Sequence, residues 1–135
     1  MARELILDAG IDRLAEAHAF LAEALDDAGC LGENRLKLEL SLEEAFVNIA
    51  NHAYPGEAGK VRLRSWLSGG HFFLELADGG IPFNPLEVPP PSLDLPLESR
   101  RIGGLGIHMI RESMDGVGYE RREGRNILTL DKKLA

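Results

Sequence analysis

The segment from Glu33 to Tyr54 constrains the fold most, because it contains neither Gly nor Pro and consists largely of strong helix formers. Part of it, Leu36 to Leu42, alternates apolar and polar residues as a strand does. The whole segment is longer than ordinary strands, so we predict a single long helix over Glu33–Tyr54. Apolar residues lie on several faces of this helix, which favours a position against a sheet.

Local patterns elsewhere predict two further helices and several short strands. Six of the seven prolines lie between Pro82 and Pro96, so we expect a long irregular loop or lid there. The helices are expected over Ile11–Ala28 and from just after Gly106 to near Asp115, and the strands over Glu4–Asp8, Val61–Leu67, Phe72–Ala77, around Tyr119, and over Ile127–Leu130. This order predicts an α+β two-layer sandwich, with a mixed, mostly antiparallel sheet and helices on one face.

Size and composition favour one globular domain over residues 1–135. The formal net charge of −7 argues against direct binding to nucleic acid, which needs a clustered basic surface. No window approaches the roughly 18 apolar residues of a membrane span, and the N-terminal residues do not resemble a signal peptide. The single cysteine, Cys30, excludes an internal disulfide and fits the cytoplasm, and we expect it in the core without a catalytic role.

Three glycines, Gly103, Gly104 and Gly106, stand where an apolar-periodic helix is expected to begin. Glycines let the backbone approach a ligand, and the first turn of a helix presents free N–H groups to an anion. The same pattern is also typical of a plain tight turn. The segment contains no P-loop motif and lacks the context of a dinucleotide fingerprint, and no pair of residues has the spacing of a zinc site.

Glu44, Asn48 and His52 form a polar stripe on the long helix, because their spacing of four residues places them on one face. Such a stripe is either a solvated face or a functional one. The amide oxygen of Asn48 is a hard ligand suited to Mg²⁺, and the Glu44 carboxylate lies one turn earlier. Glu43 is rotated off this face, so we interpret it as a surface acid, and we expect His52 to be a packing or helix-terminal residue.

Asp78 is expected at the end of a strand, followed by Gly79 and Gly80, where a side chain can point into a pocket. An ionised carboxylate only accepts hydrogen bonds. It therefore suits the 6-amino group of adenine and not the 6-oxygen of guanine. A plain Asp-Gly turn is the alternative interpretation of this segment.

The segments Glu44–Tyr54, Asp78–Pro85 and Arg101–Arg111 together resemble the N, G1 and G2 boxes of GHKL-type ATP-binding domains. Within that superfamily the chain is most similar to the stand-alone anti-sigma factor serine kinases. Pro82 occupies the place of the second glycine found in histidine kinases and chaperone ATPases, and this departure matches the anti-sigma subgroup.

The resemblance implies the Bergerat ATP-binding fold, ATP and Mg²⁺ as ligands, and a role for each motif. Glu44 is then the catalytic base and Asn48 the metal and cofactor ligand. Asp78 and Gly80 would contact the base. The phosphate segment would consist of Gly103, Gly104, Leu105 and Gly106.

The implied function is that of an anti-sigma regulatory factor, which phosphorylates an anti-sigma-factor antagonist on serine and binds a sigma factor as a homodimer. The alternative is a catalytically weak ATP-binding module that regulates through nucleotide-dependent protein binding. A histidine-kinase fragment fits less well, because we find no phosphoacceptor helix ahead of the ATP-binding motifs. Arg100 or Arg101 would lie near the terminal phosphate by their place in the sequence.

Overall fold

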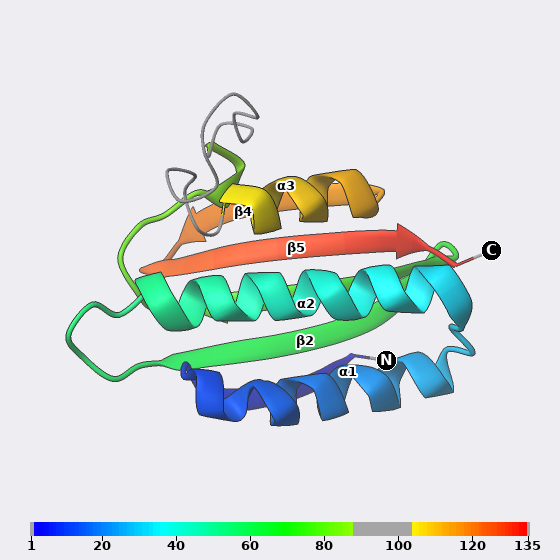
Figure 1. Ribbon diagram of the computed structural model, residues 1–135, viewed down its shortest axis with the longest axis horizontal. Coiled ribbons are helices and arrows are strands. Elements are labelled where there is room, and N and C mark those ends of the chain that lie inside the picture. The colour runs from blue at the N-terminus through cyan, green and yellow to red at the C-terminus, as the bar shows by residue number, and fades with distance from the viewer. Residues whose placement is uncertain (1, 88–103, 135) are drawn as a thin grey trace.

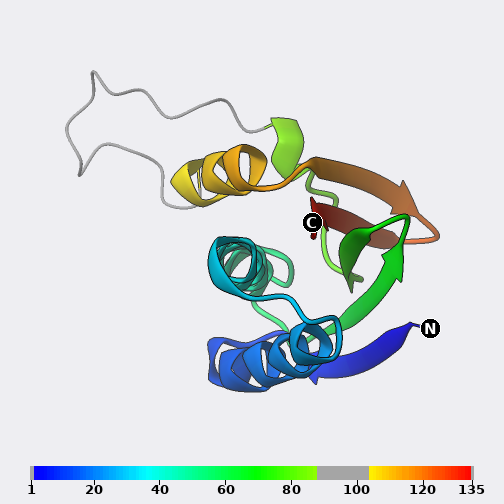
Figure 2. The same cartoon turned by 90° about the vertical axis from the view of Figure 1, so that its right-hand side faces the viewer.

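The computed structural model of the chain describes residues 2–87 and 104–134. Three helices lie in one layer against one face of a five-stranded sheet (Figures 1 and 2). The helices are α1 (Leu14–Asp27), α2 (Gly32–His52) and α3 (Gly104–Ser113), with short 3-10 turns η1 (Ile11–Arg13) and η2 (Pro85–Glu87). The strands are β1 (Arg3–Asp8), β2 (Lys60–Ser68), β3 (His71–Asp78), β4 (Gly116–Arg122) and β5 (Arg125–Lys133).

The strands follow the order β1-β2-β3-β5-β4, and each of the four pairings is antiparallel. The predicted α+β two-layer sandwich is confirmed. We expected a mixed sheet, but among the described residues no parallel pair occurs. Two tight hairpins, β2–β3 and β4–β5, account for two of the four pairings, because a two-residue turn joins only antiparallel strands.

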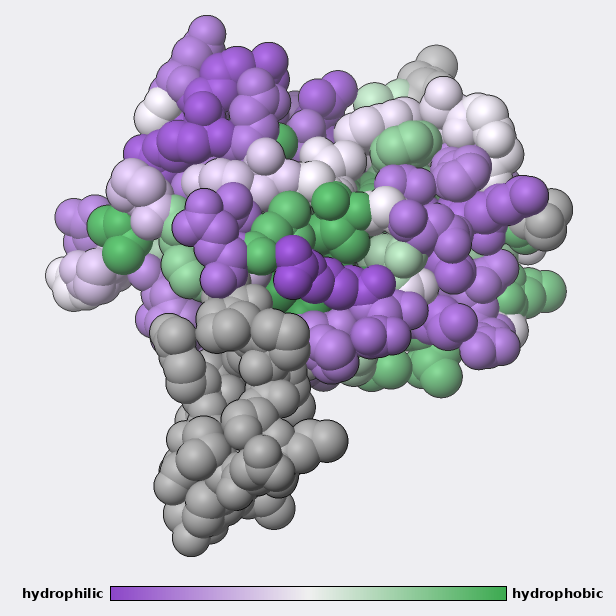
Figure 3. Space-filling model, turned by 90° about the horizontal axis from the view of Figure 1, so that it is seen from above, coloured by the Kyte–Doolittle hydropathy of each residue, from purple (hydrophilic) through white to green (hydrophobic). Residues whose placement is uncertain are grey.

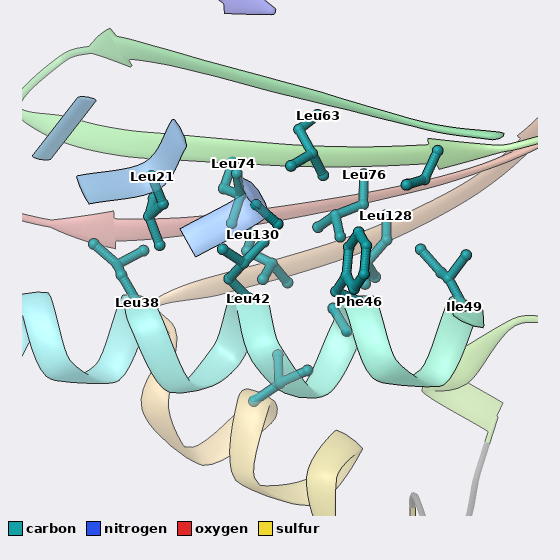
Figure 4. Packing of buried hydrophobic residues seen from close by; sticks show 14 of the residues in the cluster. Leu21, Leu38, Leu42, Phe46, Ile49, Leu63, Leu74, Leu76, Leu128 and Leu130 are labelled. Carbon is teal, nitrogen blue, oxygen red and sulfur yellow. The ribbon is translucent and has the colours of Figure 1, made fainter. Parts of the chain in front are cut away.

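Helix α2 forms the centre of the core. The side chains that it buries recur every three or four residues and face the strands, as Figure 4 shows for Leu38, Leu42, Phe46 and Ile49. They pack against strand residues that include Leu63, Leu74, Leu76, Leu128 and Leu130. Each buried apolar side chain contributes about 1.5–3 kcal/mol, which explains why the helical pattern prevails over the strand-like alternation of Leu36–Leu42.

The boundaries of three helices differ from the predictions. The long helix covers Gly32–His52 instead of Glu33–Tyr54. Helix α3 begins at Gly104, so the predicted start after Gly106 is wrong. The predicted first helix divides into η1 and α1. Residues 88–96 of the loop or lid predicted between Pro82 and Pro96 lie outside the described residues. None of the helices in the described part of the chain is long and apolar enough to cross a membrane.

Candidate nucleotide-binding site

A pocket lies between the C-terminal half of α2 and the end of the sheet where β3 finishes. Apolar side chains form most of its wall, and a few polar groups face it, which suits a flat ring with polar edges. The lining residues are Ala45, Asn48, Ile49, His52 and Ala53 of α2, Leu76, Asp78, Ile81, Phe83 and Pro85 on and after β3, Ile107 of α3, and Tyr119, Asn126 and Leu128 of β4 and β5.

Asp78, the last residue of β3, is the most buried acid at this pocket, with 5% of its surface exposed. Its Oδ1 atom accepts hydrogen bonds from the backbone N–H of Gly80 at 2.9 Å and from Nδ2 of Asn126 at 3.0 Å. Its Oδ2 atom has no hydrogen-bond partner among the described residues and is not sealed inside the protein. Two donors therefore hold one carboxylate oxygen, whereas no described residue donates to the other.

Gly80 brings the segment after β3 against the end of α2. A Cβ atom at Gly80 would lie 2.2 Å from the carbonyl oxygen of Ala53, so no larger residue fits without moving backbone. The same carbonyl accepts a hydrogen bond of 2.9 Å from the N–H of Ile81. The structure thus gives Gly80 a steric role in shaping the base end of the pocket.

Tyr54 holds the other side of this segment, a role that the sequence patterns did not reveal. Its hydroxyl donates to the carbonyl of Lys60 at 2.5 Å and accepts from the N–H of Gly79 at 2.7 Å. Its ring occupies the space where a Cβ of Gly59 would be. Asp78 is therefore followed by two residues whose backbone N–H groups are both anchored.

Neighbouring acids on α2 point in different directions. Glu43 lies 3.2 Å from Nε2 of His18 on α1, so it forms an inter-helix contact and is not simply a surface acid. Glu44 lies on the opposite side, against α3, and Asn48 lines the pocket one turn further on. The helix separates the two carboxylates because successive residues are rotated by about 100°. His52, the last residue of α2, also lines the pocket.

Gly106 is buried in the first turns of α3 and faces Glu44. A Cβ atom at Gly106 would lie 2.2 Å from Oε2 and 3.3 Å from Cβ of Glu44. The glycine therefore permits close contact between α2 and α3. Gly104 and Leu105 belong to the same first turn, whose N–H groups have no helical partner and suit an anion. Gly103, Arg100 and Arg101 lie outside the described residues.

Two arginines of the C-terminal third hold the segment after β3 instead of standing free in solvent. Arg111 of α3 donates to the carbonyl of Leu86 at 2.7 Å, and Arg121 of β4 donates to the carbonyl of Gly80 at 2.9 Å. Both contacts fix loop backbone that runs from the base end of the pocket toward α3.

The pocket residues fit Mg²⁺ only if a bound nucleotide and water supply most of the metal ligands. In the described part of the chain no three His, Cys, Asp or Glu side chains are placed to hold a metal. Mg²⁺ needs only one or two protein oxygens when phosphate oxygens and waters supply the rest, and the half-buried Asn48 offers one such oxygen at the pocket. Cys30 is buried, and desolvation raises the pKa of its thiol, so it stays a protonated core residue.

Seen from above, the surface of the molecule is largely hydrophilic, and a group of hydrophobic side chains lies near the middle of this view (Figure 3). An apolar pocket with an acceptor-only carboxylate at one end and a helix N-terminus nearby has the chemistry that suits a purine nucleotide. The sequence model of the histidine kinase-like ATPase domain family matches residues 7–132 of this chain. The chain belongs to that family.

Named relatives place it more narrowly. It is 34% identical to the serine/threonine-protein kinase BtrW of Bordetella bronchiseptica over 97 residues, covering 71% of this chain and 68% of the relative. It is 25% identical to the serine-protein kinase RsbW of Bacillus mycoides over 129 residues, covering 93% and 81%. These matches confirm the family and the protein serine kinase class that the motifs predict.

Solved structures confirm the fold. A structure of the RsbU and RsbW domains of a Mycobacterium tuberculosis protein matches with a TM-score of 0.69 at 18% identity, covering 99% of this chain and 32% of that one. The chain therefore spans about a third of the mycobacterial chain. The SiaB–SiaC complex of Pseudomonas aeruginosa matches with a TM-score of 0.56 at 14% identity, covering 95% and 88%.

The Gly106 contact leads to a test that separates catalysis from base binding. Gly106→Ala should displace the Glu44 carboxylate, because the new methyl group would overlap Oε2. We expect phosphoryl transfer to fall by at least about tenfold, within the range for losing a general base. Affinity for adenosine should stay within about twofold, as calorimetry would show.

Gly118→Ala is the matched control, because nothing lies within 4 Å of a Cβ at Gly118. It should leave both measurements unchanged. Wild-type phosphoryl transfer by Gly106→Ala, in a protein that folds normally, would show that the contact does not position Glu44.

Proposed function

We propose that this chain is an ATP-dependent anti-sigma kinase that phosphorylates a serine of an anti-sigma-factor antagonist. The observation that carries the nucleotide assignment is Asp78, a buried acid that lines an apolar pocket: two donors hold its Oδ1, and no described residue donates to its Oδ2. The similarity to BtrW and RsbW supports the kinase assignment.

Adenine recognition follows from the donors around Asp78. The free Oδ2 accepts a hydrogen bond from the 6-amino group of adenine, and the apolar wall formed by residues such as Ile49 and Leu76 contacts the faces of the ring. Guanine carries an acceptor at that position, so two acceptors would meet in a partly dry pocket. The site therefore favours ATP over GTP.

The phosphate end of the site lies where α2 meets α3. Bound Mg-ATP supplies the phosphoryl group, with the metal neutralising phosphate charge. Asn48 provides a protein oxygen to Mg²⁺, and the N-terminal turn of α3 faces the phosphates. The hydroxyl oxygen of the substrate serine bonds to the terminal phosphorus of ATP while Glu44 accepts the hydroxyl proton. The bridging P–O bond of ATP breaks, and ADP leaves.

A second function is supported by one specific feature: Glu44 does not line the pocket but lies on Gly106. A chain whose Glu44 does not reach the substrate hydroxyl is a nucleotide-dependent binding module with little turnover. ATP consumption with and without the antagonist separates the two functions.

The proposed partners are a sigma factor and a small antagonist domain, bound by a homodimer in the cytoplasm. The net charge of −7 supports action through proteins and not through DNA. Phosphorylation adds nearly two negative charges to the antagonist. Repulsion from the acidic chain then favours release of the phosphorylated antagonist and capture of the sigma factor, so the kinase step switches partners and regulates transcription.

Asp78→Asn tests the base pocket. Gly80 and Asn126 both donate to the 78 side chain, so they fix the new amide with its oxygen toward them and its NH₂ toward the ligand. ATP binding should weaken about 10- to 100-fold, because a charge-assisted bond worth about 1.5–3 kcal/mol is replaced by two opposed donors. The relative affinity for GTP should rise.

The control for this substitution is Asp12→Asn, which changes an acid with 84% of its side chain exposed. Calorimetric titration with ATP and GTP measures both variants. Unchanged ATP affinity in Asp78→Asn would remove Asp78 from the base pocket.

Glu44→Gln tests the catalytic base. We expect nucleotide affinity to be retained while phosphoryl transfer to the antagonist falls about 10²- to 10⁴-fold, the usual loss for a general base. Glu43→Gln is the matched control, since this carboxylate lies one residue away but contacts His18. Transfer measured with radiolabelled ATP should be unaffected in the control, and equal rates for the two variants would refute the role of Glu44.

The partner switch is tested with the full chain and ATP. With the full chain as bait, affinity capture from a lysate of the cells that express it, followed by mass spectrometry, should identify a sigma factor or a small antagonist domain. The captured antagonist should dissociate as one of its serines becomes phosphorylated. Glu44→Gln should retain the antagonist in the presence of ATP. Recovery of neither protein, together with tight DNA binding at physiological salt, would overturn the assignment.

A further inference from the structure

Asn126 is a buried polar residue that the kinase motifs do not include, and it makes four hydrogen bonds at the base end of the pocket. Only 6% of its surface is exposed. Its Nδ2 donates to Oδ1 of Asp78 at 3.0 Å and to the carbonyl of Ile81 at 2.8 Å. Its Oδ1 accepts from the N–H of Phe83 at 3.2 Å and from the hydroxyl of Tyr119 at 2.5 Å.

These four bonds fix the orientation of the Asn126 amide. An amide group has two N–H donors and one oxygen with two acceptor sites, and all of them are used. The Phe83 N–H only donates and the Ile81 carbonyl only accepts, so a flipped amide would oppose like groups at both positions. Leaving buried polar groups unpaired is costly, so the N–H that faces Asp78 is held in place.

The position of Asn126 follows from the sheet. It pairs with Asp78 in the β3–β5 ladder, and the side chains of both residues reach the pocket. Tyr119 comes from the neighbouring strand β4, and Ile81 and Phe83 from the segment after β3. A single side chain therefore joins three strands to the loop that borders the base.

We propose that Asn126 is a positioning residue for adenine specificity. By occupying Oδ1 of Asp78 together with the Gly80 N–H, it leaves Oδ2 as the acceptor that faces the 6-amino group. Without this amide the carboxylate is held by one donor only, so rotation and hydration compete with the base. This inference rests on the proposed function, because it concerns how Asp78 reads ATP.

The test compares ATP with purine riboside triphosphate, which carries hydrogen in place of the 6-amino group. In Asn126→Ala we expect ATP affinity to fall about tenfold while affinity for the analogue changes less than about twofold. A purely structural role would weaken both nucleotides equally.

Two further variants complete the experiment. Tyr119→Phe removes one donor to Asn126 and keeps the ring, so the preference for ATP over the analogue should fall at least about twofold even if Asn126→Ala does not fold. Asn34→Ala is the matched control, since Asn34 also donates to a backbone carbonyl, that of Lys133, but lies far along the chain and outside the pocket. It should leave the preference unchanged.

The outcomes separate this inference from the proposed function. If the wild type does not prefer ATP over the analogue, Asp78 does not read the amino group, and the adenine recognition assigned under the proposed function fails. If the wild type prefers ATP and both Asn126→Ala and Tyr119→Phe retain that preference, the positioning role of Asn126 is overturned, whereas the proposed function stands. An equal loss of affinity for ATP and for the analogue in Asn126→Ala also overturns the positioning role.

Discussion

The packing of α2 against the sheet is the contact on which the rest of the structure depends. Its buried face, which includes Leu42 and Phe46, forms the centre of the core, and the same helix carries Glu44 and Asn48 on a neighbouring face. Because one rigid helix carries both the core face and the polar stripe, core packing fixes the position of the stripe relative to β3. The part of the site that α2 carries is therefore positioned by the core itself.

Elements with a strong local pattern were predictable from the sequence. The segment Glu33–Tyr54 indicates a helix through its composition, and the spacing of Glu44 and Asn48 follows directly from helix geometry. Asp78 was recognisable because a strand ends there and two glycines follow. Each of these predictions needs only residues within a few positions of one another.

Residues whose role depends on contacts between distant segments of the chain were not predictable. Asn126 faces Asp78 because β5 pairs with β3, although the two residues lie 48 positions apart. Tyr54 reaches Gly79 only because α2 ends beside the loop. No local signal marks either residue. The start of α3 was misplaced for a related reason: the low helix propensity of glycine predicts a turn, whereas Gly106 is accommodated in the helix through its contact with α2.

The two ends of the pocket differ in how firmly they are held. At the base end, Tyr54, Asn126 and Arg121 satisfy backbone and carboxylate groups through specific hydrogen bonds, so recognition of the base requires little rearrangement. At the phosphate end, the Glu44 carboxylate packs on a glycine and makes no hydrogen bond to a described residue. Rigid recognition reduces the entropic cost of binding adenine, whereas a carboxylate that is not fixed by donors is able to turn toward a hydroxyl. This asymmetry supports our proposal, in which the base end recognises the nucleotide and the reactive end adjusts to a protein substrate.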